Sequence, residues 1–260
     1  MATIGHQLRP VSLSTDMETT IPLFDNCCAD IEAEYIRLGH AIGWRFLSGQ
    51  QDTLKSSAKI AFITLNPGGR FDPPDHPHES QEAGSAYRVE SWNGMLPGQS
   101  KLQVQVGIMF RLLAERLGGI DHQRLMDETL TGHFIPFRSP DYESLHSKND
   151  SLAFAVRLWG RIFDHIAPKT VITMDQLTFK HVRKMIKDRN SNHAERHIQL
   201  PTGWGKYQAD IVRFSSDSDG LTLIRLPHLS RFGIFTSNKC RQAVPRLMDA
   251  LVDGQRCGGA

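Results

Sequence analysis

Short apolar segments that end in polar or glycine-rich turns recur along the 260-residue chain, with segments of helical periodicity between them. The strands expected from this pattern span residues 60–65, 129–136, 170–174, 208–214 and 221–226. The expected helices span residues 28–47, 102–117, 151–166, 176–187 and 237–252. This alternation predicts a single-domain α/β fold, with a mostly parallel central sheet and helices on both faces.

The predicted domain covers residues 21–254, between a loose N-terminal arm at 1–20 and a C-terminal tail at 255–260. Forty per cent apolar residues suffice for a core, and a net charge of +2 leaves any DNA contact to local clusters of basic side chains. We find no apolar run of about 18 residues and no signal-peptide segment. We therefore expect a cytoplasmic monomer without membrane contact.

The chain contains four cysteines and one long irregular segment. None of Cys27, Cys28, Cys240 and Cys257 forms a CxxC pair, so we expect free thiols, no metal site and no cofactor. Residues 68–99 are rich in proline, glycine and histidine. A loop of this length inside a compact domain is usually functional.

Three polar segments follow predicted strands: LNPGGRF at 65–71, GHFIPFRSPD at 132–141 and LPHLSRFGIF at 226–235. Ligands of open α/β sheets bind beyond the carboxyl ends of the strands, so Asn66, His133 and His228 are predicted to share a site. Taken alone, LNPGG also reads as a strand-end turn and His133 as a core histidine. The chain lacks a P-loop, a GxGxxG motif and a GxSxG motif.

Together these segments resemble the motifs of the uracil-DNA glycosylase superfamily, an α/β fold. TLNPGG resembles its first motif, in the Gly-x-Asn-Pro-Gly form of the mismatch-directed branch, and HLSRF resembles its last motif, His-Pro-Ser-Pro-Leu. HFIPFRSP resembles the middle strand of the family, and VITMDQLTFKHV resembles the strand-helix unit before the last motif. The resemblance spans residues 60–246, with the loop after Phe71 unmatched. Thr64, His133, Leu229 and Arg231 depart from the motifs, so the uracil specificity of the family is not implied.

The resemblance implies a monofunctional DNA glycosylase that leaves an abasic site, because neither motif contains a lysine. Asn66 would orient the attacking water, and His228 would donate a hydrogen bond where charge develops on the leaving pyrimidine. The partner is double-stranded DNA with a flipped base, and Phe232 occupies the position of the family's wedge residue. The other expected DNA contacts flank the same strand ends: Arg70, Arg138, Ser230, Arg231 and Lys239.

Gly68 stands where uracil-specific members carry a tyrosine that blocks C5 of the base, so the resemblance implies a pocket open toward C5. The other residues expected around the base are Gly69, Phe71, Tyr87, Glu90, Trp92, Asn93 and His133. We expect a pyrimidine with a C5 substituent, such as glucosylated hydroxymethylcytosine of phage DNA, and a role in phage defence. The alternatives are a uracil or mismatched-thymine repair glycosylase, a non-catalytic DNA-binding module and an unrelated α/β hydrolase.

Overall fold

A single mixed sheet organises the computed structural model, which describes residues 15–55, 57–189, 193–215 and 220–256. Its strands lie in the order β2-β1-β3-β6-β5-β4. Their bounds are β1 Ile60–Thr64, β2 Leu130–His133, β3 Thr170–Thr173, β4 Ala194–Pro201, β5 Gln208–Ser215 and β6 Gly220–Arg225. β2, β1, β3 and β6 pair in parallel, while β5 pairs antiparallel with both β6 and β4. The predicted α/β fold is confirmed, and its sheet is mixed.

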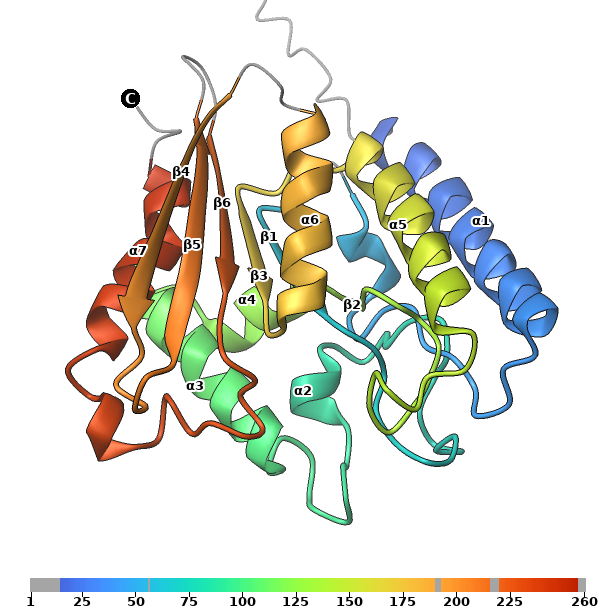
Figure 1. Cartoon of the computed structure of the whole chain (residues 1–260), viewed down its shortest axis with the longest axis horizontal. Coiled ribbons are helices and arrows are strands. Elements are labelled where there is room, and N and C mark those ends of the chain that lie inside the picture. The colour runs from blue at the N-terminus through green and yellow to red at the C-terminus, as the bar shows by residue number, and fades with distance from the viewer. Residues whose placement is uncertain (1–14, 56, 190–192, 216–219, 257–260) are drawn as a thin grey trace, which may run out of the picture.

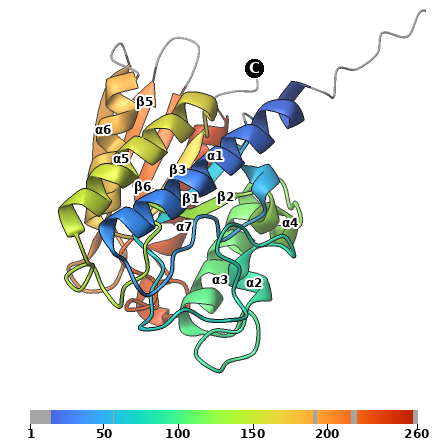
Figure 2. The same cartoon turned by 90° about the vertical axis from the view of Figure 1, so that its right-hand side faces the viewer.

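Helices cover both faces of the sheet (Figure 1). On one face α1, α5 and α6 bury their apolar sides, and Figure 2 shows α1 and α5 running beside each other. On the other face lie α2, α3, α4 and α7. The bounds are α1 Thr15–Leu38, α2 Ala86–Val89, α3 Lys101–Arg116, α4 His122–Asp127, α5 Lys148–His165, α6 Gln176–Arg189 and α7 Val244–Arg256; η1 Gln51–Thr53 and η2 Asn238–Cys240 are 3-10 turns.

The side chains of β1 alternate between the two faces of the sheet, so this short strand contributes residues to two cores. Ala61 and Ile63 face the core beneath α1, α5 and α6, whereas Ile60 and Phe62 face the core beneath α3 and α7. All five residues of β1 are buried. A central parallel strand covered on both sides reads as a continuous apolar run, and this is the pattern that made residues 60–65 recognisable.

The predicted helix at 28–47 has the wrong bounds, because α1 begins at Thr15 and ends at Leu38. Gly39 has a φ of +71°, and its N–H bonds to Ile36 O while the N–H of His40 bonds to Tyr35 O. This is the glycine-dependent end of a helix, and it separates Ile42 and Phe46 from the periodic run. α1 also begins inside the segment expected to be a loose arm; residues 1–14 of that arm lie outside the described residues.

Two further element predictions are corrected. β4 was not predicted, and the expected helix at 237–252 is divided into η2 and α7. The sequence also predicts a turn at SSDSDG, 215–220, of which residues 216–219 lie outside the described residues, as do residues 257–260 of the expected tail, Cys257 included. Residues 255 and 256 of that tail belong to α7. Cys27, Cys28 and Cys240 are free and buried. None of the described helices is long and apolar enough to cross a bilayer.

Candidate functional site

The loops that carry the predicted motifs leave the parallel strands at one edge of the sheet, the lower edge in Figure 1. Ile63 of β1 is in register with Thr173 of β3, which is in register with Arg225 of β6. Asn66 and His228 each lie three residues beyond these registered positions. Two strand spacings of about 4.8 Å separate β1 from β6, so the registered positions from which the two loops leave lie roughly 10 Å apart.

The amide of Asn66 has a fixed orientation. Its Nδ2 donates to Pro67 O at 3.1 Å, to Ser139 O at 3.2 Å and to Ser139 Oγ at 3.0 Å. Backbone carbonyls only accept hydrogen bonds, so the nitrogen must face them and Oδ1 must point the other way. No described residue donates to that oxygen, which leaves it free to accept a hydrogen bond from a water molecule or a ligand.

The two glycines after Asn66 differ in their surroundings. A Cβ added to Gly68 would meet no atom within 4 Å, whereas one added to Gly69 would approach Arg138, and Gly69 also has a φ of +113°. The Arg138 guanidinium donates to Gly68 O at 2.6 Å and lies 3.6 Å from Asp72. Arg138 is buried, so its placement organises this loop and gives no support to the predicted phosphate contact.

His133 is the last residue of β2, and its ring lies between two buried hydroxyl groups. Its Nδ1 lies 2.8 Å from Thr64 Oγ1, and its Nε2 lies 3.1 Å from Ser48 Oγ. Burial, and then the charges of Arg45 and Arg138, hold the pKa of His133 well below its ordinary value, so the ring is neutral. Both ring nitrogens already have partners, and the geometry therefore favours His133 as a support of the strand ends over a reader of the base.

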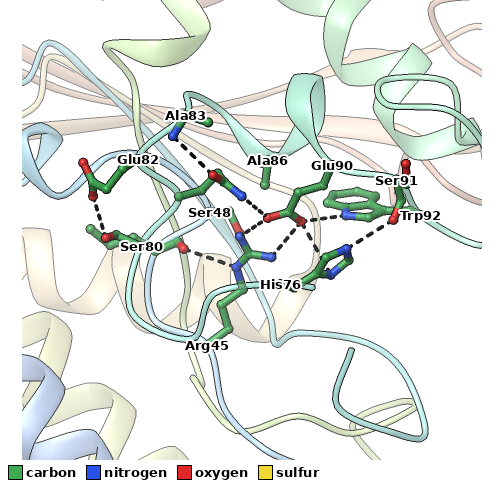
Figure 3. A network of polar contacts seen from close by, with 12 residues as sticks. Arg45, Ser48, His76, Ser80, Glu82, Ala83, Ala86, Glu90, Ser91 and Trp92 are labelled. Carbon is green, nitrogen blue, oxygen red and sulfur yellow. Dashed lines mark hydrogen bonds and ion pairs between the residues drawn. The ribbon is translucent and has the colours of Figure 1, made fainter. Parts of the chain in front are cut away.

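A buried polar cluster anchors the long loop between β1 and α3 (Figure 3). The carboxylate of Glu90 accepts from Arg45 Nη1 at 2.8 Å and Nη2 at 2.6 Å. Gln81 Nε2 and Trp92 Nε1 donate to the same carboxylate at 2.7 Å and 2.9 Å. His76 Nδ1 lies 3.6 Å from it. The carboxylate of Glu90 thus connects residue 45 with three points of the segment 76–92.

Tyr87 and Trp92 were expected to contact the substrate, and the structure places them in and beside this cluster. Tyr87 is buried, with its ring 5.4 Å from Phe62 and 5.0 Å from Trp92. Burial raises the pKa of the Tyr87 hydroxyl. Trp92 is partly buried, and its indole N–H is bonded to Glu90. Both rings therefore pack within the protein, between the loop and the sheet.

His228 lies in the loop after β6 with a defined tautomer. The Ser230 hydroxyl and the Ser230 backbone N–H lie 2.8 Å and 3.4 Å from its Nδ1. A backbone N–H can only donate, so Nδ1 accepts and the ring proton sits on Nε2. No described residue bonds to Nε2. Burial, followed by the charge of Arg231, lowers the pKa of His228, which keeps the imidazole neutral.

The predicted wedge residue Phe232 packs against two other aromatic rings. Its ring centroid lies 4.3 Å from that of Tyr207 and 6.2 Å from that of Trp204. Both partners come from the turn between β4 and β5, which the sequence analysis did not connect with the site. The signal that could have found them is the segment PTGWGKYQ, in which two aromatic residues and a lysine stand among turn residues.

Asp175, two residues beyond the end of β3, is another residue that was not singled out from the sequence. Its Oδ1 accepts from Thr178 N at 2.7 Å and caps α6, while Oδ2 is buried without a hydrogen-bond partner among the described residues. Burial raises the pKa of this carboxyl group. β3 lies between β1 and β6, so this acid emerges between the strands that carry Asn66 and His228.

The remaining predicted contacts are solvent-accessible. Arg70, Arg231 and Lys239 are exposed, and Phe71 has 73% of its surface exposed. Within the described part of the chain, no three His, Cys, Asp or Glu side chains gather as a metal-binding group. Comparisons with models of known protein families and with curated proteins find no match to this chain.

Proposed function

We propose that this protein is a monofunctional DNA glycosylase that hydrolyses the N-glycosidic bond of a modified pyrimidine and leaves an abasic site. The observation that carries the proposal is the placement of two groups at one sheet edge. These are the unbonded amide oxygen of Asn66 and the unbonded ring N–H of His228. Each group is oriented by hydrogen bonds within its own part of the fold.

This pair suits the chemistry of a glycosidic bond whose base leaves as an anion. The sugar becomes an oxocarbenium-like centre, as in ordinary glycosidases. Such a centre needs an oriented water molecule more than a strong base, and the Asn66 oxygen can accept a hydrogen bond from that water. The His228 N–H can donate to O2 of the pyrimidine, where negative charge develops. A neutral imidazole retains this donor, and the low pKa of His228 preserves it.

The open space at Gly68 supports the proposal that the excised base carries a C5 substituent. Nothing lies within 4 Å of a Cβ placed there, and Gly68 is exposed. By the family resemblance this position borders C5 of the base. A group attached to C5, such as the hydroxymethyl or glucosylated hydroxymethyl group of modified cytosine, would therefore extend into unfilled space.

The test is base release from duplexes that contain uracil, mismatched thymine, 5-hydroxymethylcytosine or glucosylated hydroxymethylcytosine, with mass spectrometry of the freed base. Asn66→Ala should lower the rate at least 100-fold, by analogy with the loss of an oxyanion-hole group. Asn149→Ala, an exposed asparagine on α5, is the matched control and should keep full activity.

Three other outcomes would count against the proposal or narrow it. Equal rates for wild type and Asn66→Ala would remove the residue from the mechanism. Strand cleavage by the pure protein without alkali or heat would contradict the monofunctional mechanism. No release from any duplex, with DNA binding that weakens as salt rises, would indicate a non-catalytic DNA-binding module.

A further inference from the structure

The turn between β4 and β5 reaches the same edge of the sheet as the His228 loop. β4 pairs antiparallel with β5 from Ala194 opposite Ser215 to Pro201 opposite Gln208. β5 in turn pairs antiparallel with β6, with Asp210 opposite Arg225 at the end of β6. The turn at residues 202–207 therefore lies beyond the carboxyl end of β6, where His228 follows. In Figure 1 this turn and the loop after β6 both lie at the lower edge of the sheet.

Close packing fixes this turn against η2 on one side and the His228 loop on the other. Gly203 has a φ of +78°, and a Cβ there would come within 2.7 Å of Cys240 Cα and 2.8 Å of Lys239 O. Thr202 closes the turn, since its Oγ1 donates to Tyr207 O at 2.7 Å. The rings of Trp204 and Tyr207 contact Phe232 on the other side. The turn is thus held in position before any ligand arrives.

The exposed aromatic residue of this group is Tyr207. It has 44% of its surface exposed, whereas Trp204 and Phe232 are partly buried against the core beneath α3 and α7. Bases of unstacked nucleic acid bind on aromatic faces of this kind. The ring of Tyr207 rests on Phe232, so a base that stacks on it would lie next to the His228 loop.

The surroundings of Tyr207 are basic. Lys206, Arg231 and Lys239 are exposed in the turn, the His228 loop and η2. The segments 201–209 and 226–248 contain no Asp or Glu at all. The nearest acid in β5, Asp210, is buried and bonded to Arg225 Nε at 2.6 Å. An exposed aromatic ring beside exposed cations suits a nucleic-acid strand, because the ring can stack on a base and the cations can contact phosphates.

We infer that the β4–β5 turn is a DNA-binding element in which Tyr207, rather than Phe232, stacks on a base beside the flipped nucleotide while Lys206 contacts the backbone. This inference rests on the proposed function, since it assigns a DNA contact beside the same site. Phe232 then serves as the support of the Tyr207 ring. The gap left by a flipped nucleotide exposes the faces of its neighbours, and an aromatic side chain can occupy it.

The experiment is equilibrium binding, by fluorescence anisotropy, to a labelled duplex that contains a tetrahydrofuran abasic analogue. This probe requires no knowledge of the excised base. Tyr207→Ala should weaken binding about tenfold, the scale of one lost base–aromatic stack. Tyr207→Phe keeps the ring and should bind like the wild type. Ile36→Ala, at a residue of α1 that is 67% exposed, is the matched control for loss of surface apolar area.

The salt dependence separates stacking from charge. Tyr207→Ala should leave the slope of log K against log salt unchanged, whereas Lys206→Gln should reduce that slope by about one. Unchanged binding by Tyr207→Ala, with a large loss in Phe232→Ala, would overturn the inference and return the contact to Phe232. Equal losses in Tyr207→Ala and Tyr207→Phe would also overturn it.

Base release from the same preparations distinguishes this inference from the proposed function. Weaker binding by Tyr207→Ala, in a protein that frees no base, would support the DNA contact and contradict the glycosylase. Base release by the wild type, with full binding and release by Tyr207→Ala, would leave the glycosylase standing and refute the inference. If the wild type binds neither the abasic nor the intact duplex, both proposals are wrong.

Discussion

Replacing Arg45 with methionine tests whether the buried cluster around Glu90 holds the loop in place. The Arg45 and Glu90 side chains are 4% and 3% exposed and share two hydrogen bonds of 2.6 and 2.8 Å. Removing one partner of a buried ion pair costs about 3–5 kcal/mol, because the other charge stays buried. Gln81 and Trp92 still donate to the carboxylate, so we expect the lower end, about 3 kcal/mol.

The loss should depend on pH in a direction that the structure sets. Burial alone would raise the pKa of Glu90, but the hydrogen bond and charge of Arg45 lower it below the ordinary value. In the wild type, this stabilisation is present above the unfolded-state pKa and is lost as pH falls through the folded-state pKa. In Arg45→Met, burial without a countercharge raises the folded-state pKa. The penalty is then full at neutral pH and shrinks as Glu90 takes up a proton at lower pH.

Urea unfolding followed by tryptophan fluorescence at pH 8 and pH 5 measures both effects. The control is Arg124→Met, which removes a pair with Glu128 whose side chains are 76% and 55% exposed. Its cost should be a small fraction of the loss expected for Arg45→Met, because solvent screens an exposed pair. A loss under about 1 kcal/mol for Arg45→Met, or equal losses at the two pH values, would refute the account of a buried charge that depends on its partner.

The proposed chemistry makes two further predictions. Gly68→Tyr should fold normally, because the added side chain enters open space, and should slow release of a C5-substituted base more than release of uracil; equal effects on both bases would contradict the open pocket. Arg231→Gln removes a charge that lowers the pKa of His228, so the acid limb of the rate profile should move to higher pH. An unshifted limb would mean that protonation of His228 does not limit the rate.

The sequence predicted the elements whose side chains are buried in a regular pattern. Strands β1, β3, β5 and β6 were found within two residues of their observed bounds, and so were the helices α3 and α6. β4 was missed because it is an edge strand: five of its eight residues are exposed, and Ile198 and Leu200 are its only large apolar side chains. The end of α1 was missed because Gly39 stops the helix while apolar residues continue at helical spacing.

The candidate site was predictable where a residue follows a strand and unpredictable where distant segments meet. Asn66 and His228 could be placed at one edge because parallel strands end there together. The burial of His133 matches the alternative interpretation of a core histidine, whereas the burial of Arg138 could not be foreseen, since it depends on contacts with Gly68 and Asp72 from another loop. The contact of Tyr207 with Phe232 depends on the pairing of β4 with β5. The exposed residues of β4 show no regular apolar pattern from which this pairing could be predicted.

The mixed sheet explains how the proposed reaction site and the proposed DNA-binding turn come to lie at the same edge. The parallel strands β1, β3 and β6 bring Asn66, Asp175 and His228 to one edge. β4 and β5 are antiparallel, so a short turn joins them, whereas parallel strands would need a long crossover connection. Because β5 is also antiparallel to β6, this turn lies at the edge where β6 ends. The antiparallel extension thus adds the turn that bears Tyr207 beside His228 and requires no extra domain to do so.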